Sequence, residues 1–264
     1  MCLLLLSYKT HPNYKLILAA NRDEFYDRPA APLQNWEDHP ELFAGRDLKE
    51  NGTWLGITKK DRIAAITNYR DMSKINYNAP TRGKLVTDFL LNEVTPEKYT
   101  SLLIENADIY NGYNLIYGST EELFYFSNIS KEPVKLPGGI YGLSNHLLNS
   151  PWPKVIKSKK IFSDLVNESY PSKDKLFDLL KDDEIYPDET LPETGLGKEL
   201  ERMVSPIFTV TEKYGTRCSS VIFADYDNNI EFTEKSYNNK TKEWITASFS
   251  FKLEKSSFNK TYHQ

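Results

Sequence analysis

The stretch AANRDEFYDRP, residues 19–29, leads an apolar segment directly into four strongly polar side chains. Polar groups at the end of a strand in a layered fold are well placed to line a site. An arginine beside carboxylates also supplies a fixed cation for a thiolate or a substrate oxygen. The alternative interpretation is a salt-bridged turn. The four residues Asn21, Arg22, Asp23 and Glu24 are therefore candidates for a binding or catalytic site at the end of this strand.

A second signal lies at the start of the chain, where Cys2 heads the apolar run CLLLL, residues 2–6. This run is shorter than the roughly 7 to 15 apolar residues of an export signal. If Met1 is removed, Cys2 carries both a thiol and an α-amine, and an amine with a pKa of about 8 can act as the base for its own side chain. Cys2 is thus a candidate nucleophile. The alternative is a small apolar residue at the start of a core strand.

Three more polar residues stand at the ends of apolar runs. Asn68 closes one run and leads into Tyr69, a candidate binding residue, and Asn145 closes another ahead of NSPWPKV, residues 149–155. A side-chain amide is a suitable donor to the oxyanion of an acyl-transfer reaction, although each asparagine alone is also a common turn former. Arg217 precedes the apolar run 219–225 and, taken alone, could equally be a surface cation.

Composition narrows the choice of partner. The 264 residues are 39% apolar and 13% aromatic, which allows a large core, and the formal net charge is −4. An acidic chain is not drawn to nucleic acid or to an anionic membrane, and no apolar window approaches the roughly 18 residues of a membrane span. The four histidines and two cysteines form no zinc motif. We expect a cytoplasmic protein that binds a small molecule and needs no metal or other cofactor.

Apolar periodicity and turn residues predict strands at both ends of the chain and helices between them. The expected strands are residues 2–7, 15–20, 52–58, 62–67, 113–117, 122–128, 138–144, 219–225, 230–237 and 243–251. The expected helices are residues 84–92, 97–106, 153–168 and 172–181. Pro29, Pro32 and Pro40 make residues 21–51 look irregular, and residues 182–194 read as a surface loop.

No repeat or low-complexity linker divides the chain. One domain is therefore expected over residues 1–254, followed by a polar tail at residues 255–264. The elements predict an α+β fold in which two antiparallel sheets are covered by helices.

The second cysteine, Cys218, adjoins Arg217. If Arg217 points into the site, the alternation of side chains along a strand predicts that Cys218 faces the other side of the sheet. Cys2 and Cys218 should then stay reduced, because a disulfide needs Cα atoms within about 7 Å. A Cys2 thiol activated by its own amine and by nearby cations should also be alkylated near neutral pH faster than Cys218.

Taken together, the motifs resemble one known family in kind and in order. They are Cys2, AANRDEFYDRP, GTWLGI at 52–57, TNYR at 67–70, GLSN with NSPWPKV at 142–155, and YGTR at 214–217. Over roughly residues 1–237 the chain resembles the NRDE family, also called the transport and Golgi organisation protein 2 family. That family is similar to N-terminal-nucleophile hydrolases of the choloylglycine hydrolase and penicillin V acylase group. The resemblance implies a four-layer αββα sandwich, two antiparallel sheets between helix layers, with a pocket at the head of the first strand.

The same resemblance assigns roles to the candidate residues. Cys2 is the implied nucleophile and base, while Arg22 and Asp23 match the arginine and aspartate after the second strand. Asn68 and Asn145 are the implied oxyanion and amine-holding groups, and Arg217 is the late cation. In the acylases the arginine and the aspartate are three positions apart, whereas here they are adjacent, so Glu24 is an alternative site carboxylate.

The implied activity is hydrolysis or acyl transfer at a linear amide that is not a peptide bond. The family is also associated with haem handling and with lipid or acyl-coenzyme A metabolism. The alternative function is therefore a non-catalytic binding or trafficking protein that holds haem, an acyl thioester or a lipid in the same pocket.

Overall fold

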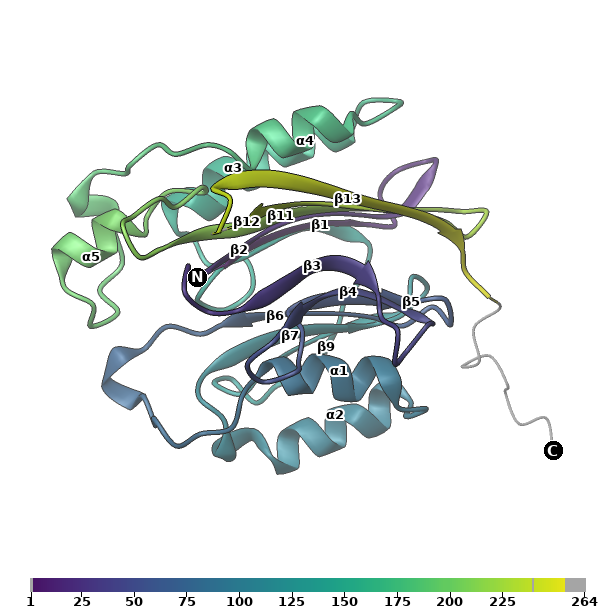
Figure 1. Cartoon of the computed structure of the whole chain (residues 1–264), viewed down its shortest axis with the longest axis horizontal. Coiled ribbons are helices and arrows are strands. Elements are labelled where there is room, and N and C mark those ends of the chain that lie inside the picture. Colours follow the sequence, from purple (N-terminus) through teal and green to yellow (C-terminus); the bar gives the residue numbers. More distant parts are fainter. Residues whose placement is uncertain (1, 239, 255–264) are drawn as a thin grey trace.

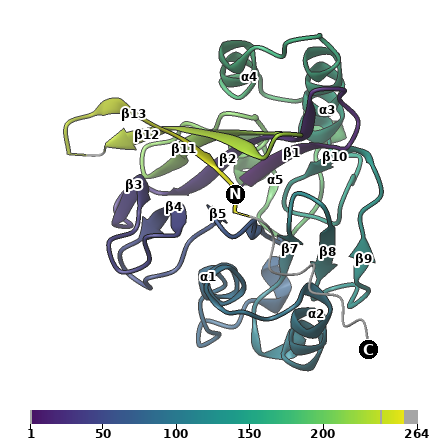
Figure 2. The same ribbon diagram turned by 90° about the vertical axis from the view of Figure 1, so that its right-hand side faces the viewer.

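Two antiparallel sheets lie face to face between two layers of helices (Figure 1). The structure, a computed structural model, describes residues 2–238 and 240–254. The view in Figure 2 shows α3 and α4 on the outside of one sheet and α1 and α2 on the outside of the other. The predicted four-layer α+β sandwich is confirmed. Met1 and the predicted polar tail lie outside the described residues.

The first sheet contains both ends of the described chain. Its order is β10-β1-β2-β11-β12-β13, with every neighbouring pair antiparallel. The strands are β1 Cys2–Tyr8, β2 Tyr14–Phe25, β10 Gly139–Leu143, β11 Tyr214–Asp225, β12 Asn229–Asn238 and β13 Glu243–Lys252. The start of β1 and the end of β2 therefore lie beside the start of β11, and this edge carries the candidate residues.

The second sheet follows sequence order, β3-β4-β5-β6-β7-β8-β9. Its strands are β3 Ala30–Asn35, β4 Leu42–Asp47, β5 Leu55–Thr58, β6 Ile63–Asn68, β7 Tyr113–Gly118, β8 Leu123–Ser127 and β9 Val134–Lys135. The α-helices are α1 Gly83–Leu91, α2 Pro96–Glu105, α3 Pro153–Val166, α4 Lys173–Leu179 and α5 Lys198–Met203, with 3-10 turns η1 Met72–Lys74, η2 Ala107–Ile109 and η3 Asp188–Thr190.

Alternating side chains divide the interior into three apolar layers. On β1, Leu4 and Leu6 enter the core between the sheets, whereas Leu3 and Leu5 pack beneath α3 and α4. The third layer joins α1 and α2 to the outer face of the second sheet around Phe89. Each inner strand is thus covered on both faces, which explains its continuous apolar run.

One expectation about the elements is wrong. Residues 21–51 are not irregular, because β2 continues to Phe25 and β3 and β4 follow it. Pro32 is tolerated since β3 is an edge strand whose pairing with β4 is interrupted between Ala31 and Gln34. The four polar residues of the opening motif consequently lie inside a strand and alternate between its two faces, rather than forming a turn after it.

Candidate active site

Cys2 occupies the first position of β1, directly opposite Arg22 of β2. Residues paired in this way project from the same face of a sheet, and Leu4 of β1 shows that this face looks toward the second sheet. A cavity of about 350 Å³ opens there, lined by Cys2, Arg22 and Asn68 among others. We refer to it as the Cys2 pocket.

Asn145 connects the Cys2 backbone to the turn after β6. Its Oδ1 accepts a hydrogen bond from the Cys2 nitrogen at 3.4 Å, and its Nδ2 donates to the Asn68 carbonyl at 2.9 Å. The Ser144 hydroxyl donates to the Cys2 carbonyl at 2.9 Å. Asn145 is fully buried, so these contacts fix its orientation. The nitrogen that becomes the α-amine when Met1 is removed is therefore oriented by a side-chain amide.

Asn68, at the end of β6, presents its amide to open space. It lines both the Cys2 pocket and a larger neighbouring cleft. Within residues 2–238 and 240–254, its side chain makes no hydrogen bond that would occupy the amide. Its backbone is held instead, because the Asn68 carbonyl accepts from Asn145 and the Arg70 nitrogen donates to the Asn145 carbonyl at 2.8 Å. Such a preorganised donor can stabilise an oxyanion.

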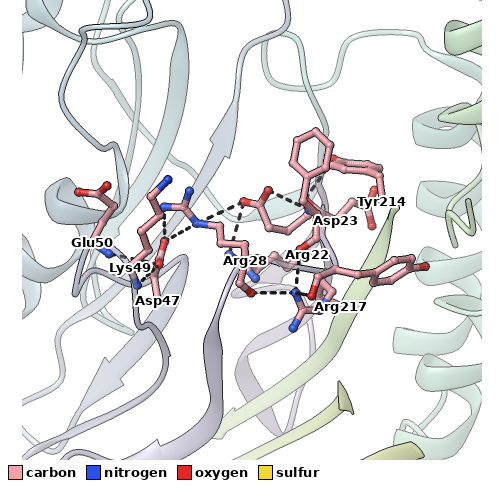
Figure 3. Close-up of polar contacts among 11 residues, drawn as sticks. Arg22, Asp23, Arg28, Asp47, Lys49, Glu50, Tyr214 and Arg217 are labelled. Carbon is pink, nitrogen blue, oxygen red and sulfur yellow. Dashed lines mark hydrogen bonds and ion pairs between the residues drawn. The ribbon is translucent and has the colours of Figure 1, made fainter. Parts of the chain in front are cut away.

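Arg22 forms part of the pocket wall. Its guanidinium lies over the Trp54 ring, 4.2 Å from the centroid, and its Nη2 is 3.5 Å from Glu24 Oε2. Glu24 also lies 3.8 Å from Arg28 Nε, and Arg28 donates two hydrogen bonds to Asp47 Oδ2 at 2.6 and 2.8 Å (Figure 3). A cation stacked on an aromatic ring in this way has a fixed position. Trp54 of the GTWLGI motif thus orients Arg22.

Asp23 and Glu24 occupy different environments. Asp23 is buried, and its carboxylate accepts hydrogen bonds from Thr216 Oγ1 at 2.7 Å and Thr209 Oγ1 at 3.5 Å. Burial raises the pKa of the Asp23 carboxyl. The backbone N–H of Asp23 donates to the Cys2 sulfur. Asp23 thus contacts Cys2 through its backbone while its carboxylate is held by Thr216 and Thr209, whereas Glu24 is paired with the outer arginines.

Burial also controls the two thiols. It raises the pKa of Cys2, and the negative charge of Asp23 adds to the effect, while Arg22 acts in the opposite direction. The pKa of Cys218 is raised well above its ordinary value by burial and by Glu234. Burial thus favours the neutral form of the Cys2 thiol and opposes the expected activation by nearby cations. The faster alkylation of Cys2 than of Cys218 near neutral pH stays a prediction.

Arg217 does not line the Cys2 pocket. Its Nη1 donates to the carbonyls of Phe25, Tyr26 and Arg28 at 2.8, 3.3 and 3.0 Å (Figure 3). It lines a separate pocket on the other side of Arg22. Arg217 therefore braces the chain after β2, and its predicted place beside Cys2 does not agree with this geometry.

A β-bulge explains the position of Cys218. Thr216 pairs with Asp23, but Cys218 pairs with Arg22, so Arg217 is an extra residue in β11. Cys218 consequently shares its sheet face with Arg22 and Cys2, and the prediction that it faces the opposite side is wrong. Both cysteines are free. They lie on β11 and β1, which flank β2, so their backbones are about 9.5 Å apart, beyond disulfide reach.

The two remaining predicted binding residues differ in position. Asn21 points away from the pocket, toward the helices: its Nδ2 donates to the Leu180 and Ile207 carbonyls at 2.8 and 2.9 Å, and its Oδ1 accepts from Ser219. Its polar atoms are thus used in the fold. Tyr69 lines the larger cleft, where its ring lies 4.9 Å from that of His146.

The sequence interpretation missed two cations near Cys2. Arg82 precedes α1, lines both the Cys2 pocket and the larger cleft, and donates from Nη1 to the Gly112 carbonyl at 2.9 Å. Lys154 lies in the NSPWPKV motif and is completely buried, with Nζ donating to the Val204 and Pro206 carbonyls at 2.9 Å each. Burial lowers the pKa of Lys154 to about 8. Because α3 contains three other lysines, Lys157, Lys159 and Lys160, nothing in the local sequence distinguished Lys154 as the buried one.

The larger cleft has a volume of about 570 Å³ and mainly apolar walls. We call it the apolar cleft. It shares Asn68, Arg82 and Asn111 with the Cys2 pocket, so the two cavities adjoin. Leu200 and Met203 of α5 form one wall, and both side chains are exposed to the cleft rather than buried in the core. An apolar group could therefore lie beside Asn68 while its polar end reaches Cys2.

Among residues 2–238 and 240–254, no three or more histidine, cysteine, aspartate or glutamate side chains are grouped as metal ligands. No helix in that part of the chain combines the length and apolar character needed to cross a membrane.

Known proteins were compared with the chain. Residues 1–239 match the model of the Transport and Golgi organisation 2 family. The human Transport and Golgi organization protein 2 homolog is 35% identical over 277 residues, which cover 96% of this chain and 100% of that protein. The Drosophila melanogaster Transport and Golgi organization protein 2 is 28% identical over 261 residues, covering 89% and 92%.

Two solved structures are also similar. One is a Caenorhabditis elegans ortholog of N-acylethanolamine-hydrolyzing acid amidase, with 10% identity, coverage of 84% of this chain and 92% of that chain, and a TM-score of 0.47. The other is a mutant of the conjugated bile acid hydrolase from Clostridium perfringens, with 10% identity, coverage of 97% and 98%, and a TM-score of 0.49.

Proposed function

The chain belongs to the Transport and Golgi organisation 2 family, and from this premise we propose that it is an N-terminal cysteine hydrolase or acyltransferase acting on a linear amide that is not a peptide bond. The observation that carries the proposal is the contact between the Cys2 nitrogen and Asn145 Oδ1 at the edge of the Cys2 pocket. A nucleophile that supplies its own base needs its nitrogen held beside its thiol, and Asn145 does this.

The first half-reaction makes a thioester. Cys2 Sγ attacks the amide carbonyl carbon while its proton passes to the α-amine. The oxyanion receives hydrogen bonds from the Asn68 amide and is stabilised by the charge of Arg82. The tetrahedral intermediate collapses, the C–N bond breaks, and the α-ammonium returns the proton to the leaving nitrogen. An amine is released, and the acyl group remains on sulfur.

The second half-reaction restores the thiol. Water, or a second amine in the case of acyl transfer, attacks the thioester carbonyl and gives its proton to the α-amine. The C–S bond breaks, and the proton returns to the sulfur of Cys2. The raised pKa of Cys2 is compatible with this scheme, because the thiol is deprotonated during attack rather than beforehand.

The apolar cleft supports an apolar acyl chain as the substrate body. It meets the Cys2 pocket at Asn68 and Arg82, where the carbonyl of such a substrate would lie. Burial of each methylene contributes about 0.8 kcal/mol to binding. An amide with a medium or long acyl chain is therefore the substrate class that these cavities favour.

The same cleft favours a second candidate function. A protein that binds an apolar ligand, such as haem or an acyl thioester, would use the apolar cleft without covalent chemistry. The two functions differ in turnover, since a carrier binds one equivalent of its ligand and releases no product.

Turnover of octanoyl p-nitroanilide distinguishes the hydrolase from the carrier. We expect steady release of p-nitroaniline beyond one equivalent of protein, loss of this release in Cys2→Ala, and no loss in Cys218→Ser, the matched thiol control. Binding of the amide without release would favour the carrier. Equal release by Cys2→Ala would remove Cys2 from the mechanism.

A further inference from the structure

A second pocket lies on the far side of the Arg22 and Trp54 wall. Its volume is about 390 Å³, and it shares Arg22, Arg28 and Trp54 with the Cys2 pocket. Arg217 and Tyr237 also line this pocket. We call it the arginine pocket. The proposed amide chemistry makes no use of it.

Arg217 is the unusual side chain of this pocket. Only 8% of it is exposed, yet it forms no ion pair with any carboxylate in the described part of the chain. Its Nη1 is occupied by three backbone carbonyls, while its buried Nε has no hydrogen-bond partner among those residues. A buried charge is normally paired, because leaving it unpaired is costly.

The surrounding charges do not compensate Arg217. Three arginines face the pocket, Arg22, Arg28 and Arg217, and two carboxylates pair with them: Glu24 contacts Arg22 and Arg28, and Asp47 binds Arg28. These three positive and two negative charges leave one positive charge. Asp27 and Lys240 also line the pocket, but both are exposed to water, which screens their charges, and the two opposite charges cancel in the count.

The bulge in β11 determines the position of the Arg217 guanidinium. Arg217 is the extra residue between Thr216 and Cys218, so its side chain does not follow the alternation of faces along β11. It lines the same cavity as Arg22. Bulges often re-aim a side chain beside a functional site. The repulsion between Arg22 and Arg217 lowers the pKa of Arg217, although burial lowers it more. The fold therefore brings together two like charges that an anion would stabilise.

The pocket walls also favour a ligand with an aromatic or apolar body. Trp54, Tyr26 and Tyr237 supply aromatic surface, and the Tyr26 and Tyr237 rings lie 5.7 Å apart. Pro29, Pro32 and Leu48 add apolar surface. We propose that the arginine pocket binds an organic oxyanion, a carboxylate or a phosphate carried on an aromatic or apolar body, with Arg217 and Arg22 as its cationic ligands. The site is independent of covalent chemistry at Cys2.

Calorimetric titration of the full chain tests this site. The probes are phenyl phosphate, benzoate, inorganic phosphate and the neutral benzamide. We expect the better of the two aromatic anions to bind at least about tenfold more tightly than benzamide, since a charge-assisted hydrogen bond to a buried arginine is gained. Phenyl phosphate against benzoate distinguishes a phosphate ligand from a carboxylate. Benzamide binding as tightly as both anions would overturn the proposal.

Variants locate the bound anion. Arg217→Gln should weaken binding by about tenfold or more. Arg82→Gln changes the Cys2 pocket but not the arginine pocket, and Arg46→Gln removes a surface arginine paired with Asp38, so both should leave the dissociation constant unchanged. Loss in Arg82→Gln with none in Arg217→Gln would overturn the proposal, because it places the anion at Cys2.

A spectroscopic measurement on the wild-type protein tests the same site and does not depend on whether Arg217→Gln folds. In wild-type protein with ¹⁵N-labelled arginine, the Nε–Hε resonance of Arg217 should shift on addition of the tighter-binding anion, because this group lacks a partner in the described structure. Unchanged Arg217 resonances at saturation would contradict the site. The same titration in Cys2→Ser should give the same shift, which separates this site from the fate of the proposed hydrolase activity.

Discussion

Cys2 and Cys218 lie on one face of the same sheet but differ in accessibility. Cys2 is half-buried at the Cys2 pocket. Cys218 lines the arginine pocket but is only 3% exposed, and its thiol contacts the buried Glu234. Burial raises both pKa values, that of Cys218 to well above its ordinary value. Iodoacetamide should therefore alkylate Cys2 at least about tenfold faster than Cys218, with a rate that still rises above pH 9 as the thiolate forms.

Peptide mapping of Cys2→Ser and Cys218→Ser separates the two rates. A Cys2 rate that is already maximal at pH 7 would show that its pKa is lowered, contrary to the direction given by burial. Equal rates for both thiols would show that Cys2 is not accessible from the pocket.

Lys154 gives a prediction about pH and stability. Burial lowers its pKa from 10.5 to about 8 in the folded protein. Between these values the unfolded chain binds one more proton than the native chain, so the free energy of unfolding gains up to about 1.4 kcal/mol per pH unit from this residue as the pH rises. Below about pH 8 both states are protonated, and this gain is absent.

Urea denaturation of wild type and Lys154→Met at pH 7.5 and 9.5 measures the effect, because the other titrating groups are common to both proteins. The free energy of unfolding of wild type should rise relative to that of Lys154→Met. A difference that stays constant between the two pH values would mean that Lys154 keeps its ordinary pKa.

At the residue scale, the sequence allowed some positions to be predicted and not others. Cys2, Arg22, Asp23, Asn68 and Asn145 could be proposed because motif and strand position agree. The structure places the first four around one pocket and joins Asn145 to the Cys2 nitrogen by a hydrogen bond. Their catalytic roles remain predictions. Arg217 could not be placed, since one inserted residue changes the face of a strand and leaves no mark in composition. Arg82 was missed because it lies in a loop without an apolar pattern.

Secondary-structure elements show the same division. Strands such as β1 and β6 are buried on both faces and could be read from their apolar runs. The edge strand β3 contains Pro32 and few buried residues, so its pairing with β4 depends on tertiary contacts. One of these is Glu234 of β12, whose carboxylate accepts from the Leu33 nitrogen at 2.8 Å. Such contacts join distant segments and cannot be read from local sequence.

The short helix α5 gives a prediction at this scale. It is tied to the turn after β6 by Glu201 and Arg70, which are 4% and 7% exposed and lie 3.2 Å apart. Removing one member of a buried pair leaves a charge uncompensated. Glu201→Gln should therefore lower the free energy of unfolding by about 3 kcal/mol.

The double variant Arg70→Met/Glu201→Met should recover most of this loss, because neither charge remains. Urea denaturation of wild type, Arg70→Met, Glu201→Met and the double variant completes the cycle. A cost below about 1 kcal/mol for Glu201→Gln would indicate that solvent reaches the pair.

At the scale of the whole molecule, the layered architecture followed from the order of strands and helices. Strands from both ends of the chain build one sheet together with β10 from its middle, and β3 to β9 build the other. The cavities could not be predicted in this way, because each is walled by segments far apart in sequence. The apolar cleft combines residues of the β6 turn with Leu200 and Tyr214, and its apolar side chains look like ordinary surface residues in the sequence.

The apolar cleft predicts a dependence on acyl chain length. In a series of p-nitroanilides from acetyl to octanoyl, kcat/KM should rise by up to about fourfold for each methylene that becomes buried. Leu200→Gln should reduce this increment while leaving turnover of the acetyl compound unchanged, since Leu200 lines the apolar cleft and not the Cys2 pocket. If kcat/KM of wild type does not change with acyl chain length, the acyl chain does not bind in the apolar cleft.

The most direct test of Cys2 as an N-terminal nucleophile is time-resolved mass spectrometry of the purified protein during turnover of octanoyl p-nitroanilide. We expect a chain that lacks Met1, a transient mass increase of one octanoyl group, and peptide mapping that places it on Cys2 as a thioester. The adduct should decay as product accumulates, and Cys2→Ala should never form it. A chain that retains Met1, or turnover with no acyl adduct at Cys2 when the acyl-enzyme is trapped by acid quench, would contradict the mechanism.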